Sequence, residues 1–167
     1  MISEKIGAGL NEQIHAEIYS SYLYLSMEVY FASQNFSGFT NWMRAQVQEE
    51  LSHVAKTIQF LKDRNGRVLL KAVESPPTEW QSPLAAFEAS LVHEQLVSGR
   101  INSLVELAME DRDHATVSFL QWFVTEQVEE EATVSGIIQQ LRMVADAPAG
   151  VFLLDRELGS RTFTAEA

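Results

Sequence analysis

This chain contains four amphipathic segments with a helical repeat of apolar residues. In each segment, ionisable residues occupy positions that the repeat predicts to be buried in a core. In the first segment the repeat advances in steps of four and three residues, and its members are Leu10, Ile14, Glu17, Ser21 and Tyr24. The ionisable residues at core positions of the four repeats are Glu17, Glu50, His53, Glu94 and Glu130. A buried carboxylate without its partner destabilises a fold by roughly 3–5 kcal/mol, and several carboxylates facing one core also repel one another. A chain that keeps this pattern therefore requires positive charge between its helices, and metal ions are the obvious candidate.

The composition restricts the classes of protein to which the chain can belong. With 167 residues it is predicted to form one domain over residues 1–167, and its net charge of −11 argues against a nucleic-acid-binding surface. The absence of cysteine excludes disulfides, cysteine-ligated zinc or iron–sulfur sites, and thiol catalysis. The N-terminus lacks the basic start and apolar run of a signal peptide, and no apolar run approaches the ~20 residues that cross a bilayer. We therefore expect a cytoplasmic protein without a membrane partner.

The pattern of apolar residues and breakers predicts an all-α chain with four long helices. Ser3 is a suitable N-cap for the first helix, Asn65-Gly66 ends the second, and Ser82-Pro83 is a strong start for the third. The expected long helices cover residues 3–33, 37–64, 83–110 and 114–144, and Pro148 opens a short fifth helix over 149–158.

The lengths of the links between these helices predict their topology. The links after the first and third helices are short, which makes two antiparallel hairpins, whereas residues 67–82 form a long link that contains Pro76 and Pro77. A long link lets the chain travel the full length of the bundle before the third helix begins. The prediction is a ferritin-like four-helix bundle with one long crossover between helices two and three, plus a short C-terminal fifth helix.

The ionisable residues have the spacing of a site for two metal ions. Residues three apart on an α-helix share a face, so Glu50 and His53 point a carboxylate and an imidazole at the same place. Di-iron bundles use a Glu from each of two helices and a Glu-x-x-His pair from each of the other two; here Gln127 and Glu130 replace the second pair. Four carboxylates with a neutral imidazole balance two divalent cations and favour Fe(II) or Mn(II), with Zn(II) as a competitor. The alternative is a buried network of hydrogen-bonded carboxylates.

Three segments resemble the non-haem ferritins of bacteria and archaea, and the resemblance extends over nearly the whole chain. The segments are NEQIHAEIYSSYLY at residues 11–24, QEELSH at 48–53 and FLQWFVTEQVEEE at 119–131. Bacterioferritins use a Met for haem at the position of Ser52, so no haem is expected here. Rubrerythrins add a Cys-rich iron domain, and this chain has no Cys.

The resemblance implies two iron ions per subunit and indicates their ligands. One iron would be held by Glu17, Glu50 and His53. The other would be held by Glu50, Glu94 and Glu130, with Glu50 as the bridge between the two ions.

The same resemblance implies roles for polar residues around the pair. Gln127 would be a hydrogen-bonding or oxygen-side residue beside the metals rather than a strong ligand. Glu49, Glu126 and Glu129 would form a third iron site, although a solvated acidic face is the alternative for this trio. Tyr24 would hydrogen-bond a ligand or donate an electron during oxidation, and by residue type alone it fits a core aromatic equally well.

The function implied by the resemblance is iron storage and detoxification. The chain would be a ferroxidase that oxidises Fe(II) to Fe(III) with O2 or H2O2 at the di-iron centre. Ferric oxyhydroxide mineral would collect inside a hollow homo-oligomeric shell of roughly 24 subunits. Tyr30, Phe31, Leu84 and Phe152 are expected on outward faces suited to that association. Release of the stored iron would require a reductant as a partner.

Two other functions remain as alternatives. A di-iron peroxide reductase or related oxidoreductase would turn over without storing mineral and would need an electron donor. The missing second His and the absence of Cys count against it. A purely structural or partner-binding bundle would have apolar residues at the polar core positions.

Overall fold

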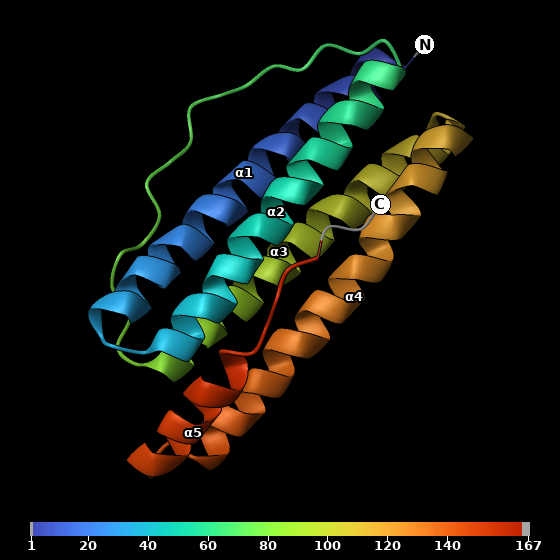
Figure 1. Cartoon of the computed structure of the whole chain (residues 1–167). Helices are drawn as coiled ribbons and strands as arrows, with labels where there is room; N and C mark the ends of the chain where they lie inside the picture. Colours follow the sequence, from blue (N-terminus) through green and yellow to red (C-terminus); the bar gives the residue numbers. More distant parts are fainter. Residues whose placement is uncertain (1, 165–167) are drawn as a thin grey trace.

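The computed structural model describes residues 2–164, and this part of the chain forms five α-helices and no β-strand. Helices α1 (Glu4–Ser33), α2 (Ser37–Asp63), α3 (Pro83–Glu110) and α4 (His114–Met143) are long, and α5 (Pro148–Leu158) is short. Figure 1 shows the long helices running side by side, with α5 against one end of the bundle. The predicted all-α fold with a short fifth helix is confirmed. Over residues 2–164, none of the helices has both the length and the apolar character that a membrane span requires.

Side-chain caps explain why three of the long helices, α1, α3 and α4, begin where they do, and the cap of α1 is the predicted Ser3. The Ser82 hydroxyl accepts a hydrogen bond from the Ala85 amide at 3.1 Å, and Pro83 occupies the first turn of α3. Asp113 accepts a hydrogen bond from the Thr116 amide at 3.1 Å at the start of α4. Because these caps satisfy amides that lack a partner in the first helical turn, they stabilise a helix start at these residues.

Residues in the left-handed backbone region close the two hairpins. The φ angle is 62° at Asn35, between α1 and α2, and 54° at Arg112, between α3 and α4. Asn65, two residues after the end of α2, has a φ of 57°. Asn adopts this region more readily than most residues, because its short side chain can hydrogen-bond locally. The turns therefore reverse the chain within a few residues and give the short links that the sequence predicts.

The long connection between α2 and α3 lies along α1 as an extended strap (Figure 1). The Asn11 side-chain amide donates a hydrogen bond to the Arg67 carbonyl at 3.0 Å, and the Ser26 hydroxyl donates one to the Pro77 carbonyl at 2.6 Å. These bonds satisfy carbonyl groups of a segment that has no regular secondary structure of its own. The strap carries the chain from one end of the bundle to the other, which confirms the predicted crossover.

The helices pack as two hairpins, α1 with α2 and α3 with α4, and α5 contacts both α2 and α4. The close approach of α5 to α2 requires Gly38, because a Cβ atom there would lie 1.5 Å from the carbonyl oxygen of Asp155. The buried Asp155 carboxylate in turn accepts a hydrogen bond from the Phe39 amide at 2.8 Å. These contacts fix α5 against the start of α2.

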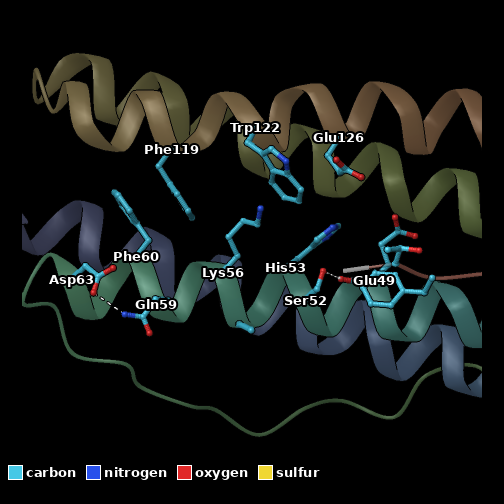
Figure 2. Close-up of a pocket in the computed structure, with 13 residues that line it drawn as sticks. Glu49, Ser52, His53, Lys56, Gln59, Phe60, Asp63, Phe119, Trp122 and Glu126 are labelled. Carbon is cyan, nitrogen blue, oxygen red and sulfur yellow. Dashed lines mark hydrogen bonds between the residues drawn. The ribbon is translucent and has the colours of Figure 1, made fainter. Parts of the chain in front are cut away.

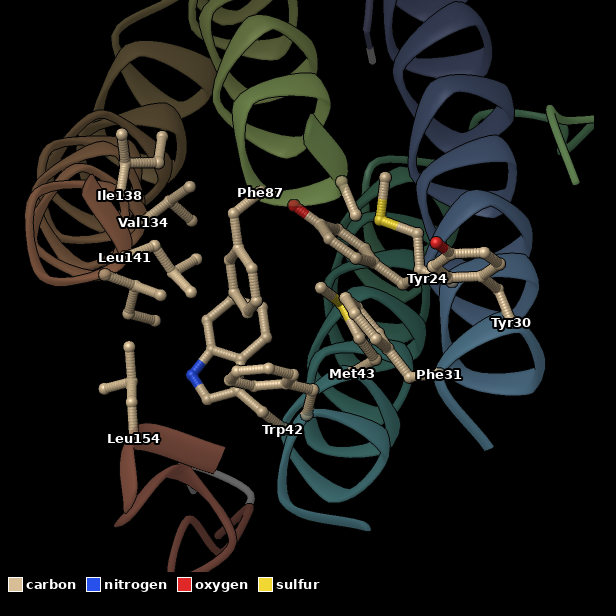
Figure 3. Close-up of a cluster of buried hydrophobic side chains, with 14 of the residues drawn as sticks. Tyr24, Tyr30, Phe31, Trp42, Met43, Phe87, Val134, Ile138, Leu141 and Leu154 are labelled. Carbon is tan, nitrogen blue, oxygen red and sulfur yellow. The ribbon is translucent and has the colours of Figure 1, made fainter. Parts of the chain in front are cut away.

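Two apolar clusters fill the two ends of the bundle. The aromatic cluster lies beside α5, and Figure 3 shows its side chains pointing inward; it includes Tyr24, Tyr30, Phe31, Phe39, Trp42, Phe87, Val134, Ile138, Leu141 and Leu154. The aliphatic cluster fills the opposite end and contains Ile6, Leu10, Ile14, Leu61, Leu104, Ala108 and Leu120. Both clusters bury apolar surface and hold the helices in register on either side of the middle of the bundle.

The prediction that Tyr30 and Phe31 face outward is wrong. Phe31 is fully buried, and Tyr30 is 9 % exposed and donates a hydrogen bond from its hydroxyl to the Trp80 carbonyl at 2.6 Å. The crossover strap covers Tyr30, which the local periodicity of α1 cannot indicate. Phe31 instead packs in the core against Phe39 and Phe87, seven residues after Tyr24 on the same apolar repeat. Phe152 is exposed, as expected, and Leu84 is half-buried.

Candidate metal centre

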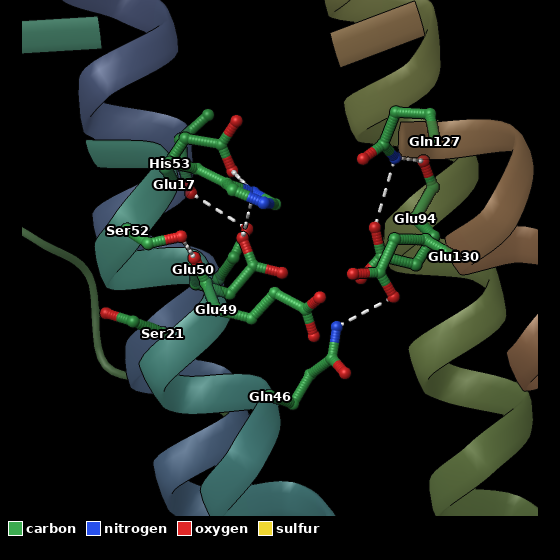
Figure 4. Close-up of polar contacts among 12 residues, drawn as sticks. Glu17, Ser21, Gln46, Glu49, Glu50, Ser52, His53, Glu94, Gln127 and Glu130 are labelled. Carbon is green, nitrogen blue, oxygen red and sulfur yellow. Dashed lines mark hydrogen bonds and ion pairs between the residues drawn. The ribbon is translucent and has the colours of Figure 1, made fainter. Parts of the chain in front are cut away.

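A cluster of buried polar side chains lies between the two apolar clusters. Glu17 comes from α1, Glu50 and His53 from α2, Glu94 from α3 and Glu130 from α4, and each of them is between 1 and 4 % exposed. Figure 4 shows the side chains of α1 and α2 facing those of α3 and α4 across the bundle. The structure thus brings together the five residues that the sequence singles out.

Glu17, Glu50 and His53 form one compact group of possible ligands, with one ligand atom of each lying within 4.8 Å of the others. His53 Nδ1 is 3.6 Å from Glu50 Oε2 and 4.0 Å from Glu17 Oε2. The Gln13 side-chain amide donates a hydrogen bond to Glu17 Oε1 at 2.7 Å, whereas Glu17 Oε2 is buried without a hydrogen-bond partner among residues 2–164. A buried carboxylate oxygen in this condition, close to two further ligand atoms, is suited to binding a cation.

Glu94 and Glu130 face this group from the other hairpin. The Tyr24 hydroxyl donates a hydrogen bond to Glu94 Oε1. The Gln127 amide donates to Glu94 Oε2 and to the Glu94 carbonyl, both at 3.1 Å. The Gln46 amide donates to Glu130 Oε2 at 2.8 Å. Each carboxylate is therefore oriented by a buried donor and keeps oxygen lone pairs free to bind metal.

Glu49, Glu126 and Glu130 form a second compact group, which we call the outer group; their ligand atoms also lie within 4.8 Å of one another. Glu130 Oε1 is buried and has no hydrogen-bond partner in the described part of the chain. The sequence prediction for a third site named Glu129 in place of Glu130. Glu129 is exposed, whereas Glu126 and Glu130 are four residues apart and share a face of α4.

Burial raises the pKa of the carboxyl groups in the centre. Loss of hydration is the largest cause for Glu17 and for Glu50, and the charge of a neighbouring carboxylate raises each pKa further. Burial also raises the pKa of Glu94, although the hydrogen bonds from Tyr24 and Gln127 act in the opposite direction. These groups resist ionisation together as long as no cation lies among them.

The pKa of Glu130 is raised to about 8, first by burial and then by the charges of Glu94 and Glu49, whereas Gln46 and Arg161 lower it. A divalent cation bound here would lower this pKa, because its charge favours the ionised carboxylates and so opposes the effects of burial and of the neighbouring negative charges. Binding of metal to the centre is therefore expected to release protons.

A cavity of about 630 Å³ lies between α2 and α4 and reaches both groups of ligands (Figure 2). His53 of the first group and Glu49 and Glu126 of the outer group line it, together with Trp122. The edge of the Trp122 ring packs against the His53 ring, with 5.3 Å between their centroids. The cavity offers a route along which a small ion or O2 can approach the centre.

Three polar residues at the site were not singled out from the sequence, namely Gln13, Gln46 and Arg161. Gln13 and Gln46 each stand four residues before a predicted ligand, Glu17 and Glu50, so their spacing on the helix could have identified them. Arg161 contacts a residue 112 positions earlier in the chain, and no local pattern signals such a contact.

The chain is similar to ferritins along nearly its whole length. A family model described as Ferritin-like domain matches residues 7–144. The bacterial non-heme ferritin of Bacteroides fragilis (strain 638R) is 45% identical over 161 residues, which cover 96% of this chain and 100% of that protein. The bacterial non-heme ferritin of Staphylococcus aureus (strain MRSA252) is 37% identical over 166 residues, which cover 99% of this chain and 100% of that protein.

Solved structures agree with these relatives. An engineered closed form of the Archaeoglobus fulgidus ferritin matches with a TM-score of 0.97 at 55% identity, covering 98% of this chain and 100% of that chain. The open pore ferritin from the same archaeon matches with a TM-score of 0.96 at 54% identity, covering 97% of this chain and 100% of that chain. The predicted ferritin-like bundle is therefore confirmed. On the agreement of sequence, family model and fold, the chain belongs to the ferritin-like domain family, among the non-haem ferritins of bacteria and archaea.

Proposed function

We propose that this protein stores iron and that it oxidises Fe(II) to Fe(III) with O2 at a centre for two iron ions. The observation that carries the proposal is the meeting of four buried carboxylates from four helices, in which Glu17 Oε2 and Glu130 Oε1 lack hydrogen-bond partners among the described residues. Such a cluster can be fully ionised in a low-dielectric interior only when cations compensate its charge. Membership of the ferritin-like family supports iron as the cation.

In this proposal one iron binds Glu17, Glu50 and His53, and the other binds Glu50, Glu94 and Glu130. Glu50 bridges the two ions, in keeping with its place beside both His53 and the carboxylates of the facing hairpin. Oxygen ligands with a single imidazole suit Fe(II). The buried amides that hydrogen-bond these carboxylates would orient them, as groups behind a metal ligand commonly do.

A third iron ion is proposed at the outer group. Its ligands would be Glu49 and Glu126, with Glu130 shared with the di-iron centre. The cavity between α2 and α4 gives access to Glu49 and Glu126, so this ion would lie on the way into or out of the centre.

The proposed reaction takes one electron from each of two Fe(II) ions, so that 2 Fe(II), O2 and 2 H⁺ give 2 Fe(III) and H2O2. Four carboxylates balance two divalent ions but leave two trivalent ions with excess positive charge. Hydroxide or oxide derived from water would neutralise this excess, and the hydrolysed Fe(III) product would then leave the centre as fresh Fe(II) enters. The protein supplies ligand geometry and a pocket with little water around the reacting ions.

Storage of mineral requires an enclosed space, which a single bundle lacks. We therefore propose that the chain, as one domain over residues 1–167, assembles in the cytoplasm into a closed shell of roughly 24 copies. Exposed apolar side chains support association; Val29 on α1 is 58 % exposed, and Phe152 and Leu153 on α5 are 59 % and 65 % exposed.

The proposal is tested by loading the protein aerobically with a large excess of Fe(II), separating the products by size, and counting iron in each fraction. Iron far above two ions per chain, travelling with a very large assembly, is the expected result. About two ions per chain on a small oligomer, the load of one di-iron bundle, would overturn storage and favour a di-iron peroxide reductase. Absence of bound iron would overturn both functions.

A further inference from the structure

Residues 159–164, which follow α5, fold back along α2 and lie beside the outer group. Figure 1 shows this segment running from α5 along the bundle. The Asn41 side-chain amide of α2 holds it, donating hydrogen bonds to the carbonyls of Gly159 at 3.2 Å and Arg161 at 2.8 Å. Phe163 and Thr164, a little further along, line the cavity that reaches His53. The tail is therefore part of the wall beside the candidate metal ligands.

The Arg161 side chain extends from this tail toward α2 and makes three contacts with it. Its Nη2 atom forms an ion pair with Glu49, and its Nη1 atom donates a hydrogen bond to Gln46 Oε1 at 2.6 Å. Its guanidinium carbon lies 4.4 Å from the centroid of the Trp42 ring. The planar guanidinium can make hydrogen bonds and a ring contact at the same time, which an ammonium group does less well. These contacts hold the cation in one position.

Gln46 extends this contact to a second member of the outer group. Its oxygen accepts from Arg161, and its nitrogen donates to Glu130 Oε2 at 2.8 Å. Arg161 thus acts on Glu49 directly and on Glu130 through a single amide. Two of the three residues of the outer group are therefore engaged by one cationic side chain.

The outer group can nevertheless still bind a cation. Glu130 is 4 % exposed, and its Oε1 atom has no hydrogen-bond partner within residues 2–164. One ligand atom from each of Glu49, Glu126 and Glu130 lies within 4.8 Å of the others. A divalent cation bound here would draw on the same Glu49 carboxylate that now pairs with Arg161. Two cations close to one carboxylate repel each other, so binding of one weakens binding of the other.

We propose that Arg161 is a tethered cation that competes with Fe(II) for Glu49, so that the C-terminal tail sets the affinity of the outer group for metal. The inference rests on the proposed function, because it assigns a role to a residue beside the proposed third iron. Iron must compete with the guanidinium for the charge of the Glu49 carboxylate in order to bind. The ion is therefore held weakly and exchanges readily, which suits a point of passage between the cavity and the di-iron centre.

The test is an anaerobic Fe(II) titration of the assembled protein at equilibrium, which gives the dissociation constant of the third ion separately from those of the first two. Arg161→Gln should tighten the third ion about tenfold and leave the first two within about twofold. Arg142→Gln is the matched control. It removes the same charge from an exposed ion pair with Glu88, about 18 Å along α4 from Glu130, and should leave the third ion unchanged.

Two results would overturn the proposal. The first is a third-ion affinity in Arg161→Gln equal to that of the wild type or of Arg142→Gln. The second is found with Glu49→Gln in the background, where adding Arg161→Gln should tighten the third ion clearly less than tenfold, since the shared ligand is gone and only the path through Gln46 to Glu130 remains. An equal gain in affinity without Glu49 would show that competition for this carboxylate is not the cause. Failure of the wild type to bind the first two ions would instead overturn the proposed di-iron centre, so the two failures are distinguishable.

Discussion

Burial stabilises the aromatic cluster beside α5, whereas in the centre of the same bundle it destabilises the ionised form of the carboxyl groups. In the aromatic cluster, Phe87 packs against Phe31, Phe39 and Trp42 with ring centroids 5.1 to 6.0 Å apart. Contacts of this kind stabilise the fold without any ion. In the centre, an equally buried set of carboxylates has raised pKa values and oxygen atoms without partners. The ends of the bundle therefore provide the stability that lets its middle keep side chains suited only to a cation.

This difference separates the residues needed for folding from the residues needed for binding. The apolar clusters hold the four helices in register from both ends, so the carboxylates meet even though they repel one another. Substitutions at the ends should change stability and leave the metal site alone. Substitutions in the middle should do the reverse.

The largest expected effect is at the aromatic end, with Phe87→Ala. Phe87 is fully buried, and deletion of such a ring leaves a cavity that lowers the free energy of unfolding by about 3–5 kcal/mol. This loss is measured by unfolding the metal-free protein with increasing urea, at one fixed concentration of protein. Phe87→Leu, which retains more of the volume, should lose clearly less. Chains that remain folded should still bind two metal ions, and loss of metal binding in folded Phe87→Ala would break the separation of the two regions.

In the middle of the bundle, Glu50→Gln should have the opposite effect. The variant keeps the volume of the side chain but removes the proposed bridging charge, so the initial rate of Fe(II) oxidation should fall on the order of 100-fold or more. The melting temperature of the metal-free protein should be no lower than that of the wild type, because one buried carboxyl group is removed. Stopped-flow absorbance and thermal unfolding measure the two quantities.

The exposed Glu106 of α3 provides the control for this variant. Glu106→Gln removes the same charge and should leave both the initial rate of Fe(II) oxidation and the melting temperature unchanged. Rapid oxidation retained in Glu50→Gln would contradict the ligand assignment. A large drop in its melting temperature would contradict the view that the centre costs stability when no cation is bound.

The sequence predicts the buried ionisable residues in the middle of the bundle better than it predicts the residues around them. Glu17 and Glu130 could be identified because a carboxylate in an apolar helical repeat conflicts with the pattern of its own segment. Tyr30 was assigned to the wrong face because the strap that covers it is irregular, and its path depends on hydrogen bonds to side chains of α1. Phe31 continues the apolar repeat of Tyr24, so its burial could have been predicted from the sequence. Arg161 was missed because its partner lies on a helix far away in the chain.

The choice between Glu129 and Glu130 as a member of the outer group shows what helical spacing alone cannot predict. Both residues are within one turn of Glu126, and spacing along a helix permits either of them to join it. The structure places a ligand atom of Glu130, rather than of the exposed Glu129, beside those of Glu49 and Glu126, and this depends on how α4 packs against α2. A single sequence does not contain this information locally.

The raised pKa of Glu130, about 8, predicts how the stability of the metal-free protein depends on pH. Between its ordinary pKa near 4.5 and about 8, the folded protein retains a proton that the unfolded chain releases. The stability contributed by this group is therefore fully present below pH 4.5 and is lost as pH rises toward 8. The share of Glu130 in this loss should be about 2 kcal/mol between pH 6 and pH 8, as measured by thermal or urea unfolding, and Glu17, Glu50 and Glu94 should add to it.

Two controls identify the source of this pH dependence. Glu130→Gln should reduce the loss by the share of this group and leave the part that comes from Glu17, Glu50 and Glu94, whose pKa values are also raised. Saturating Zn(II), which is not oxidised, should also reduce the slope, because a bound cation favours the ionised carboxylates. A stability that is constant or that increases between pH 6 and pH 8 would show that burial in the centre does not destabilise the charged form.

The smallest expected effect lies where the two regions meet, at Tyr24. Its ring belongs to the aromatic cluster, and its hydroxyl donates a hydrogen bond to Glu94 in the centre. Tyr24→Phe keeps the ring and removes only that bond, which contributes about 1 kcal/mol, so oxidation should slow about fivefold with little change in melting temperature. Tyr22→Phe, which alters a half-exposed ring, should leave the oxidation rate unchanged. A marked loss of stability in Tyr24→Phe without any change in rate would place Tyr24 with the packing residues, whereas a loss of rate alone would place it with the metal centre.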